Sequence, residues 1–408
     1  MTAPTVQTLE TIAGGVSTPK GFRAAGVSAG IKAKPGALDL ALLVSDRPAT
    51  AAAVFTTNRA LAAPVLVSRE HLARSGGLAR AVIVNSGCAN ACTGDEGLRA
   101  ANVMATATAA LLGCPVDQVL VASTGVIGVA LPIDKIEQGL PKAVEALGVD
   151  RGSLAAQAIM TTDPFPKEAA ARVSIGGHDI TIGGMAKGSG MIEPMLATML
   201  GFVTTDAGIP KPLLDRALRE VVNDTFNAIT VDGECSTNDC VMVLANGASG
   251  VMVDESTYDA FADALRTVCL RLAIDIVRGG EGATKLITVS VTGAATPDEA
   301  RKAAKAIANS LLVKTAIHGG DPNWGRLIAV AGRAGVAFEL SRAKVAIGPI
   351  VLFDNGRPHD EAAPEAAQYL KNDDIGVTVD LGAGKASSTV WTCDLSAEYV
   401  RINAEYRT

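Results

Sequence analysis

The chain has 408 residues with a formal net charge of −6 at pH 7, and 48% of its residues are hydrophobic while only 3% are aromatic. A chain of this length exceeds the usual size of one core, so we expect two lobes, or one large layered α/β unit with a smaller unit appended. The modest negative charge argues against nucleic acid as a partner. The lack of any ~18-residue apolar stretch or signal-peptide pattern predicts a soluble, cytoplasmic protein with no membrane partner.

In the first half of the chain, short apolar runs alternate with amphipathic segments, which predicts a mixed α/β fold. The first twenty residues are polar and predict a frayed arm. Strands are expected at 38–44, 51–55, 64–68, 81–84 and 118–122, and helices at 98–112, 133–147 and 153–160. Two alternating segments around Gly176-Gly177 predict a β-hairpin that leads the chain directly to Lys187.

The second half continues the same mixture and predicts a smaller second lobe at roughly 286–390. Helices are expected at 211–227, 256–277, the latter with a serine cap, and 297–313, and strands at 241–245, 345–353, 376–381 and 388–393.

The seven cysteines are spread along the chain, and the four histidines form no zinc-type pair. Cys88-x3-Cys92 and Cys235-x4-Cys240 have the spacing of a metal clip, but a zinc site would need further ligands nearby. We therefore predict free thiols in a reducing compartment, no bound metal and no cofactor.

The segment from Lys187 to Asp206 joins a glycine-rich loop to an apolar run of strand length that contains a single hydroxyl, at Thr198. From the residues alone, Thr198 is a β-branched residue that suits a strand, and Lys187 is a solvated surface lysine. A phosphate-binding loop is not expected, because neither 186–190 nor 279–285 has the G-x-x-x-x-G-K-[ST] order.

The run Lys-Gly-Ser-Gly-Met-Ile-Glu-Pro-Met-Leu-Ala-Thr-Met-Leu at 187–200 resembles the self-cleaving segment of the ornithine acetyltransferase family of arginine biosynthesis. The resemblance to this family extends over about residues 21–408. The other matching segments are 21–32, 231–239, 278–285, 321–326 and the C-terminal ten residues. It implies an α/β fold, a layered αββα sandwich of the type found in self-cleaving ornithine acetyltransferases and aminopeptidases, with a second smaller α/β lobe.

By this resemblance the chain is cut between Ala197 and Thr198. The products are an α chain, residues 1–197, and a β chain, residues 198–408, intertwined in a heterotetramer of two α and two β chains. A threonine hydroxyl needs a base beside it, and the freed α-amine, with a pKa of about 7.7 to 8.0, supplies one. Before cleavage, Thr198 Oγ1 can attack the Ala197 carbonyl in an N-to-O acyl shift, after which water opens the ester.

The resemblance also assigns roles to other residues. A strand that ends in Ser-Thr-Gly can be an ordinary turn, but the family places its oxyanion hole at the positions of Thr124 and Gly125. Glu281 can position the substrate's amine or adjust the charge of the Thr198 amine, and we leave both roles open. No role is assigned to the segment 321–326. The family's substrate contacts carry over to Thr161, Lys187, Thr198, Glu281, Asn403 and Thr408.

The function implied is transfer of acetyl from N2-acetyl-L-ornithine to L-glutamate in a ping-pong cycle through an acetyl-Thr198 ester. Acetyl-CoA is a possible second donor, as in the bifunctional members of the family. The alternatives are an N-terminal-nucleophile amidase or aminopeptidase of the same fold, which releases its acyl group to water, and a non-catalytic α/β scaffold with Thr198 buried.

Overall fold

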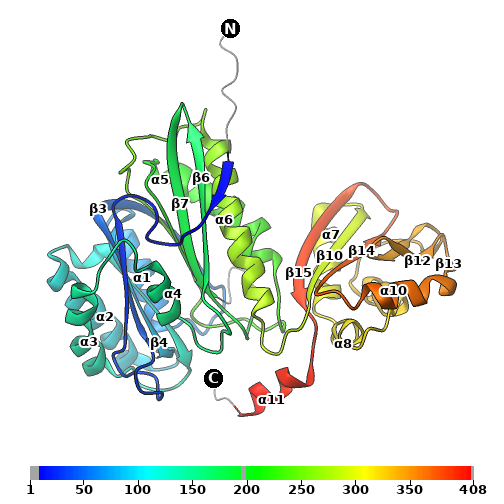
Figure 1. The fold of residues 1–408 in the computed structure, drawn as a ribbon, viewed down its shortest axis with the longest axis horizontal. Helices are drawn as coiled ribbons and strands as arrows, with labels where there is room; N and C mark the ends of the chain where they lie inside the picture. The colour runs from blue at the N-terminus through cyan, green and yellow to red at the C-terminus, as the bar shows by residue number, and fades with distance from the viewer. Residues whose placement is uncertain (1–8, 194–198, 406–408) are drawn as a thin grey trace, which may run out of the picture.

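The computed structural model describes residues 9–193 and 199–405, which form two β-sheets flanked by helices (Figure 1). The larger sheet has nine strands in the order β1-β6-β7-β8-β9-β3-β4-β5, with β2 paired to β3. Its strands are β1 (Leu9–Ile12), β2 (Phe22–Val27), β3 (Leu40–Phe55), β4 (Leu78–Cys88), β5 (Val119–Val126), β6 (Lys167–Ile175), β7 (His178–Lys187), β8 (Leu200–Thr205) and β9 (Cys240–Ala245).

The 16-residue strand β3 joins two halves of this sheet. Its first part pairs with β2 and β4, its last six residues pair with β9, and the register against β4 shifts between Val44 and Ala49. Such an irregularity bends a strand and increases its twist. The segments 38–44 and 51–55, predicted as separate strands, are therefore the two ends of one strand.

The two halves of the sheet pack face to face. Leu43, Val82 and Leu120 from one half share a buried cluster with Phe202 and Met242 from the other. The outer faces are covered by helices, and α4 (Gly152–Ala158) joins the inner cluster. The covering helices are α5 (Lys211–Asp224) and α6 (Tyr258–Arg278) on the β6–β9 half, and α1 (Ala63–Arg74), α2 (Gly94–Leu112) and α3 (Ile133–Glu145) on the β3–β5 half. This is the predicted αββα layering.

The smaller sheet has six strands in the order β13-β12-β11-β14-β10-β15 and a buried core of its own. It holds β10 (Leu286–Ala294), β11 (Lys344–Ile347), β12 (Ile350–Asp354), β13 (Arg357–Pro358), β14 (Asp374–Asp380) and β15 (Ala386–Cys393), with α7 (Pro297–Ala308), α8 (Leu311–Gly319), α9 (Trp324–Arg333) and α10 (Ala363–Tyr369). The last helix, α11 (Ala397–Glu405), leaves this unit and runs back beneath the larger one (Figure 1).

The segment 321–326 begins α9. The Asn323 side chain accepts the Arg326 N–H at 3.1 Å, and the Trp324 ring stacks on Phe353 with 4.8 Å between centroids. A capped helix start and an aromatic pair stabilise the smaller unit. This segment thus has a structural role in packing.

Several predicted elements were wrong. Residues 64–68 lie in α1, because Pro64 suits the first turn of a helix and the buried residues Ala63, Val67 and His71 recur every four positions. Residues 9–12 of the predicted arm pair with β6 as β1. The single helix and the single strand expected at 297–313 and 345–353 are α7 with α8 and the hairpin β11–β12. Thr257, not a serine, stands at the N-cap of α6.

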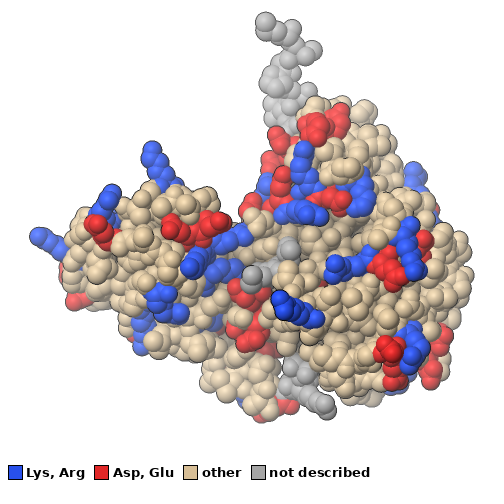
Figure 2. All heavy atoms as spheres, turned by 180° about the vertical axis from the view of Figure 1, so that it is seen from behind, with Lys and Arg blue, Asp and Glu red and all other residues tan. Residues whose placement is uncertain are grey.

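Figure 2 shows the face opposite to that of Figure 1, where acidic and basic side chains alternate in small groups. Among the helices in the described parts of the chain, none combines the length and the hydropathy that a membrane span requires.

Candidate active site

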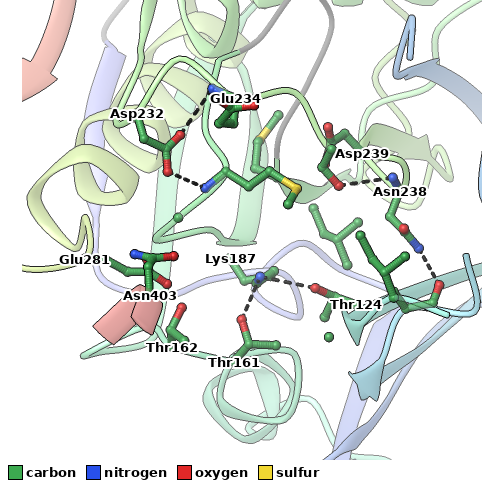
Figure 3. A pocket seen from close by; sticks show the side chains of 18 of the residues that line it. Thr124, Thr161, Thr162, Lys187, Asp232, Glu234, Asn238, Asp239, Glu281 and Asn403 are labelled. Carbon is green, nitrogen blue, oxygen red and sulfur yellow. Dashed lines mark hydrogen bonds between the residues drawn. The ribbon is translucent and has the colours of Figure 1, made fainter. Parts of the chain in front are cut away.

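A pocket lies where β5 and β7 end and β8 and β9 begin (Figure 3). Asn238, just before β9, closes one side of it, because its Nδ2 donates to the carbonyls of Ala89 at 2.6 Å and Ser123 at 2.9 Å. The pocket thus draws on both halves of the large sheet. Its described lining includes Thr124, Gly125, Thr161, Lys187, Gly190, Met191, Met199, Leu200, Asp232, Asn238, Asp239, Glu281, Tyr399 and Asn403.

Lys187 joins two other predicted site residues. Its Nζ donates to Thr161 Oγ1 at 2.9 Å and to Thr124 Oγ1 at 3.2 Å, and the residue is only 8% exposed. The solvated-lysine interpretation is therefore wrong. Because Thr124 Oγ1 accepts from Lys187, its own hydroxyl hydrogen remains available to donate into the pocket.

Gly125 has a conformation and surroundings that only glycine fits. Its φ is +127°, and a Cβ there would lie 2.4 Å from the carbonyl carbon of Gly87. The β4–β5 register is irregular at the same place, between Gly87 and Cys88. Glycine therefore allows β5 to end with its backbone pressed against β4 at the pocket wall.

Asp163 connects Thr161 to the loop after Lys187. Its carboxylate accepts the Thr161 N–H at 2.9 Å and the Gly188 N–H at 2.7 Å, and it pairs with Lys167 Nζ at 2.6 Å. Burial alone would raise the pKa of Asp163, but the charges of Lys187 and Lys167 lower it to about 2. Asp163 is not among the site residues predicted from the sequence.

Glu281 and Asn403 meet at another side of the pocket. Asn403 Nδ2, on α11, donates to Glu281 Oε2 at 2.7 Å, and Glu281 is 5% exposed. A Cβ on Gly190 would lie 2.5 Å from Glu281 Oε2, so this glycine makes room for the carboxylate. The predicted residues Ala197, Thr198 and Thr408 lie outside the described residues.

Comparison with known proteins identifies the family. Residues 23–408 match the model of the ArgJ family. The chain belongs to this family. The arginine biosynthesis bifunctional protein ArgJ of Symbiobacterium thermophilum is 52% identical over 406 residues, which cover 98% of this chain and 100% of that protein. The family of arginine-biosynthesis enzymes predicted from the sequence is confirmed.

Two solved structures are also similar. An arginine biosynthesis bifunctional protein ArgJ from Bacillus halodurans is 47% identical, with a TM-score of 0.50, over 51% of this chain and 100% of the solved one. An ornithine acetyltransferase from Mycobacterium tuberculosis, complexed with ornithine, is 46% identical, with a TM-score of 0.43, over 47% of this chain and 100% of that one.

In this member of the ArgJ family, the Asp232 carboxylate holds the backbone of Met191 and Ile192 by hydrogen bonds. This carboxylate accepts the N–H groups of Met191 at 2.7 Å and Ile192 at 2.8 Å, and the Tyr399 hydroxyl at 3.1 Å. Met191 has a φ of +59°, which is unusual for a residue with a side chain. Asp232 lies in the polar loop 231–239, but its role could not be predicted from the sequence, because its partners lie about 40 and 167 positions away.

Proposed function

We propose that this member of the ArgJ family is a glutamate N-acetyltransferase, an acyltransferase that moves acetyl from N2-acetyl-L-ornithine to L-glutamate. The observation that carries the proposal is the convergence of Lys187, Thr124 and Thr161, from three separate segments, in one pocket. Met199 also lines this pocket and directly follows Thr198 in the chain. The proposed nucleophile is therefore the chain neighbour of a pocket residue.

Self-cleavage between Ala197 and Thr198 is part of the proposal. It would convert the Thr198 nitrogen from an amide into an amine, which can act as a base for the hydroxyl of the same residue. The solved chain from Bacillus halodurans supports a two-chain product, because its whole length corresponds to 51% of this chain. Assembly of two α and two β chains is proposed from the resemblance, and a cytoplasmic location is also part of the proposal.

The reaction then has two halves. Thr198 Oγ1 attacks the acetyl carbonyl of acetylornithine, its proton passes to the α-amine, and the C–N bond breaks as ornithine leaves with that proton. Glutamate's amine then attacks the ester and restores the threonine. The Thr124 hydroxyl and the Gly125 N–H are proposed to stabilise the oxyanion in both halves.

The charges of the pocket suit amino-acid substrates. We propose that Lys187 and Thr161 bind a substrate carboxylate, and that Asn403, Glu281 and the terminal Thr408 complete the substrate site. Donor and acceptor amides have nearly equal energy, so no resident cofactor or metal is proposed. Acetyl-CoA is retained as a possible second donor.

The runner-up is a hydrolase that uses the same threonine but releases acetyl to water. The two functions differ in their need for glutamate. A transferase should form N-acetylglutamate and release little acetate, because the site must exclude water while the ester exists. Acetate release that is equally fast with and without glutamate would favour the hydrolase.

The Thr198→Val variant tests the proposal, with Thr315→Val on the exposed face of α8 as the control. Denaturing mass spectrometry should find the wild type and the control as two chains, and Thr198→Val as one intact chain without transfer activity. Cleavage of Thr198→Val at this bond, or transfer at the wild-type rate, would mean that another residue is the nucleophile.

A further inference from the structure

Lys314 is a buried lysine of the smaller unit that no function above has used. It lies on α8 and is 2% exposed. Its Nζ donates to the carbonyl oxygens of Val231 at 2.8 Å and Cys393 at 2.5 Å and to Thr392 Oγ1 at 2.9 Å. The Cys393 thiol is a more distant contact at 3.7 Å. The three hydrogens of the ammonium thus bind residues that lie 78 to 83 positions away in the sequence.

The Lys314 ammonium is buried without an acidic partner. In the parts of the chain that the structure describes, no Asp or Glu forms an ion pair with it. Lysine is almost never fully buried unless it is paired, because burying a lone charge is costly. An apolar side chain of similar length would fill the same space at a lower desolvation cost. The charge at this position therefore points to a need for these acceptors to meet at one place.

The first segment that Lys314 binds carries Asp232. The Val231 carbonyl belongs to the peptide group that joins Val231 to Asp232, so Lys314 fixes the backbone at which Asp232 begins. Asp232 lines the pocket, and its carboxylate accepts the Tyr399 hydroxyl as well as two backbone N–H groups. A shift of this peptide group would move all three of these hydrogen bonds.

The second segment that Lys314 binds carries Asp394. The Cys393 carbonyl belongs to the peptide group that joins Cys393 to Asp394. The Asp394 side chain is 0% exposed and accepts the Thr284 N–H at 2.7 Å. Asp394 also lies 2.6 Å from Nδ1 of His318, which is four residues after Lys314 on α8. Helix α8 therefore holds this segment at two successive residues.

This second segment leads directly into α11, which brings Tyr399 and Asn403 to the pocket. Just before the helix, Ser396 Oγ donates to the Gly282 carbonyl at 2.6 Å. Gly282 directly follows Glu281, whose carboxylate accepts from Asn403 at 2.7 Å. The segment before α11 and the segment after Glu281 are thus joined to each other, and Lys314 and His318 attach the first of them to the smaller unit.

We propose that Lys314 is a positioning residue, which acts through the two peptide groups that it binds and fixes the side of the pocket formed by Asp232, Glu281 and Asn403. This inference rests on the proposed function, because that function places the substrate in this pocket. The ammonium holds the loop of Asp232 and the segment before α11 at a fixed separation. The smaller unit thereby contributes to substrate binding without lining the pocket through α8.

The position of this side of the pocket indicates which kinetic constant depends on Lys314. In Figure 3, Glu281 and Asn403 lie on one side of Lys187, and Thr124 lies on the other. The Lys314 ammonium makes no bond to Thr124 or Lys187 in the described chain. Its loss should therefore weaken substrate binding and leave the acyl-transfer step itself nearly unchanged.

The first test measures steady-state kinetics of the full-length enzyme with acetylornithine and glutamate. For Lys314→Met we expect kcat/KM for both substrates to fall at least about tenfold, while kcat at saturation stays within about threefold of wild type. An unchanged kcat/KM, or a kcat that falls as far as kcat/KM, would overturn the inference.

The matched control is Val379→Ala on β14, which removes a 0% exposed side chain from the core of the same unit. The cavity should lower Tm, but kcat/KM should stay within about twofold of wild type, because Val379 contacts neither segment through Lys314. If Val379→Ala lowered kcat/KM as much as Lys314→Met, loss of stability would explain the effect and the inference would fail.

The second test is a double-mutant cycle of Lys314→Met with Tyr399→Phe. The Tyr399 hydroxyl binds Asp232, so both changes disturb the same arrangement and their losses should not multiply. The double variant should lose at least about threefold less kcat/KM than the product of the single losses. Losses that multiply in full would show that the two residues act independently, which would overturn the inference.

If Lys314→Met does not fold, Thr392→Val decides. This change removes one acceptor, keeps the branched shape and leaves the bonds of Lys314 to the carbonyls of Val231 and Cys393. The value of kcat/KM should fall at least about threefold at constant kcat, and wild-type kcat/KM would overturn the inference. A wild-type enzyme that transfers no acetyl would instead refute the proposed function itself.

Discussion

Lys167 Nζ lies 2.6 Å from Asp163 Oδ1 in an ion pair whose two side chains are both 0% exposed. The same carboxylate accepts the Thr161 and Gly188 N–H groups, so one buried charge connects two segments beside the proposed substrate site. Removing one partner of such a pair leaves the other charge buried without compensation.

Asp163→Asn should therefore lower the free energy of unfolding by roughly 3 to 5 kcal/mol, as for other broken buried pairs. The matched control is Asp215→Asn, which breaks the Lys211–Asp215 pair of 2.7 Å with side chains 37% and 36% exposed. That change should cost at most about 1 kcal/mol. Urea unfolding followed by circular dichroism measures the free energy of unfolding of both variants. If the two variants lost the same free energy, the Asp163–Lys167 pair would not be buried as described.

Stability should also fall in acid through Asp163. Its pKa in the folded chain is about 2, below the ordinary aspartate value of 3.8. Its stabilising contribution is therefore present above pH 3.8 and is lost as the pH falls from 3.8 toward 2. The difference in unfolding free energy between wild type and Asp163→Asn should shrink by on the order of 2 kcal/mol over this range. A difference that is independent of pH would contradict the low pKa.

The contrast between Lys187 and Asp163 indicates what the sequence can predict. Lys187, Thr124 and Glu281 lie in short runs that resemble a family, so their membership of a site could be predicted without a fold. Asp163 was not among the predicted site residues, because its bond to Gly188 spans 25 positions and exists only once β6 and β7 pair.

Some elements of the fold could likewise be predicted from the sequence, and others could not. Periodic helices such as α3 and the hairpin of β6 and β7 were predicted within a few residues, because their patterns are local. The continuity of β3 was not predicted, because the polar segment Ser45-Asp46-Arg47 interrupts its apolar pattern and only pairing on both sides extends the strand through it. Tertiary contacts decide such elements.

Lys187→Met should weaken substrate binding. A charge-assisted hydrogen bond is worth about 1.5 to 3 kcal/mol, so kcat/KM for acetylornithine should fall by about 10- to 100-fold. Lys142→Met on the exposed face of α3 is the control and should stay within about twofold. Steady-state kinetics with both substrates measure this effect, and an unchanged kcat/KM in Lys187→Met would remove Lys187 from the substrate site.

Thr124→Val should impair the chemical step more than substrate binding. The Thr124 hydroxyl accepts from Lys187 Nζ at 3.2 Å, which leaves its hydrogen free to donate to an oxyanion. Loss of one such donor lowers kcat by about 10²- to 10³-fold, while valine keeps the branched shape that β5 requires. Thr124→Ser keeps the donor and should retain most of the activity. If serine and valine reduced kcat equally, packing rather than hydrogen bonding would explain the loss, and Thr124 would not belong to the oxyanion hole.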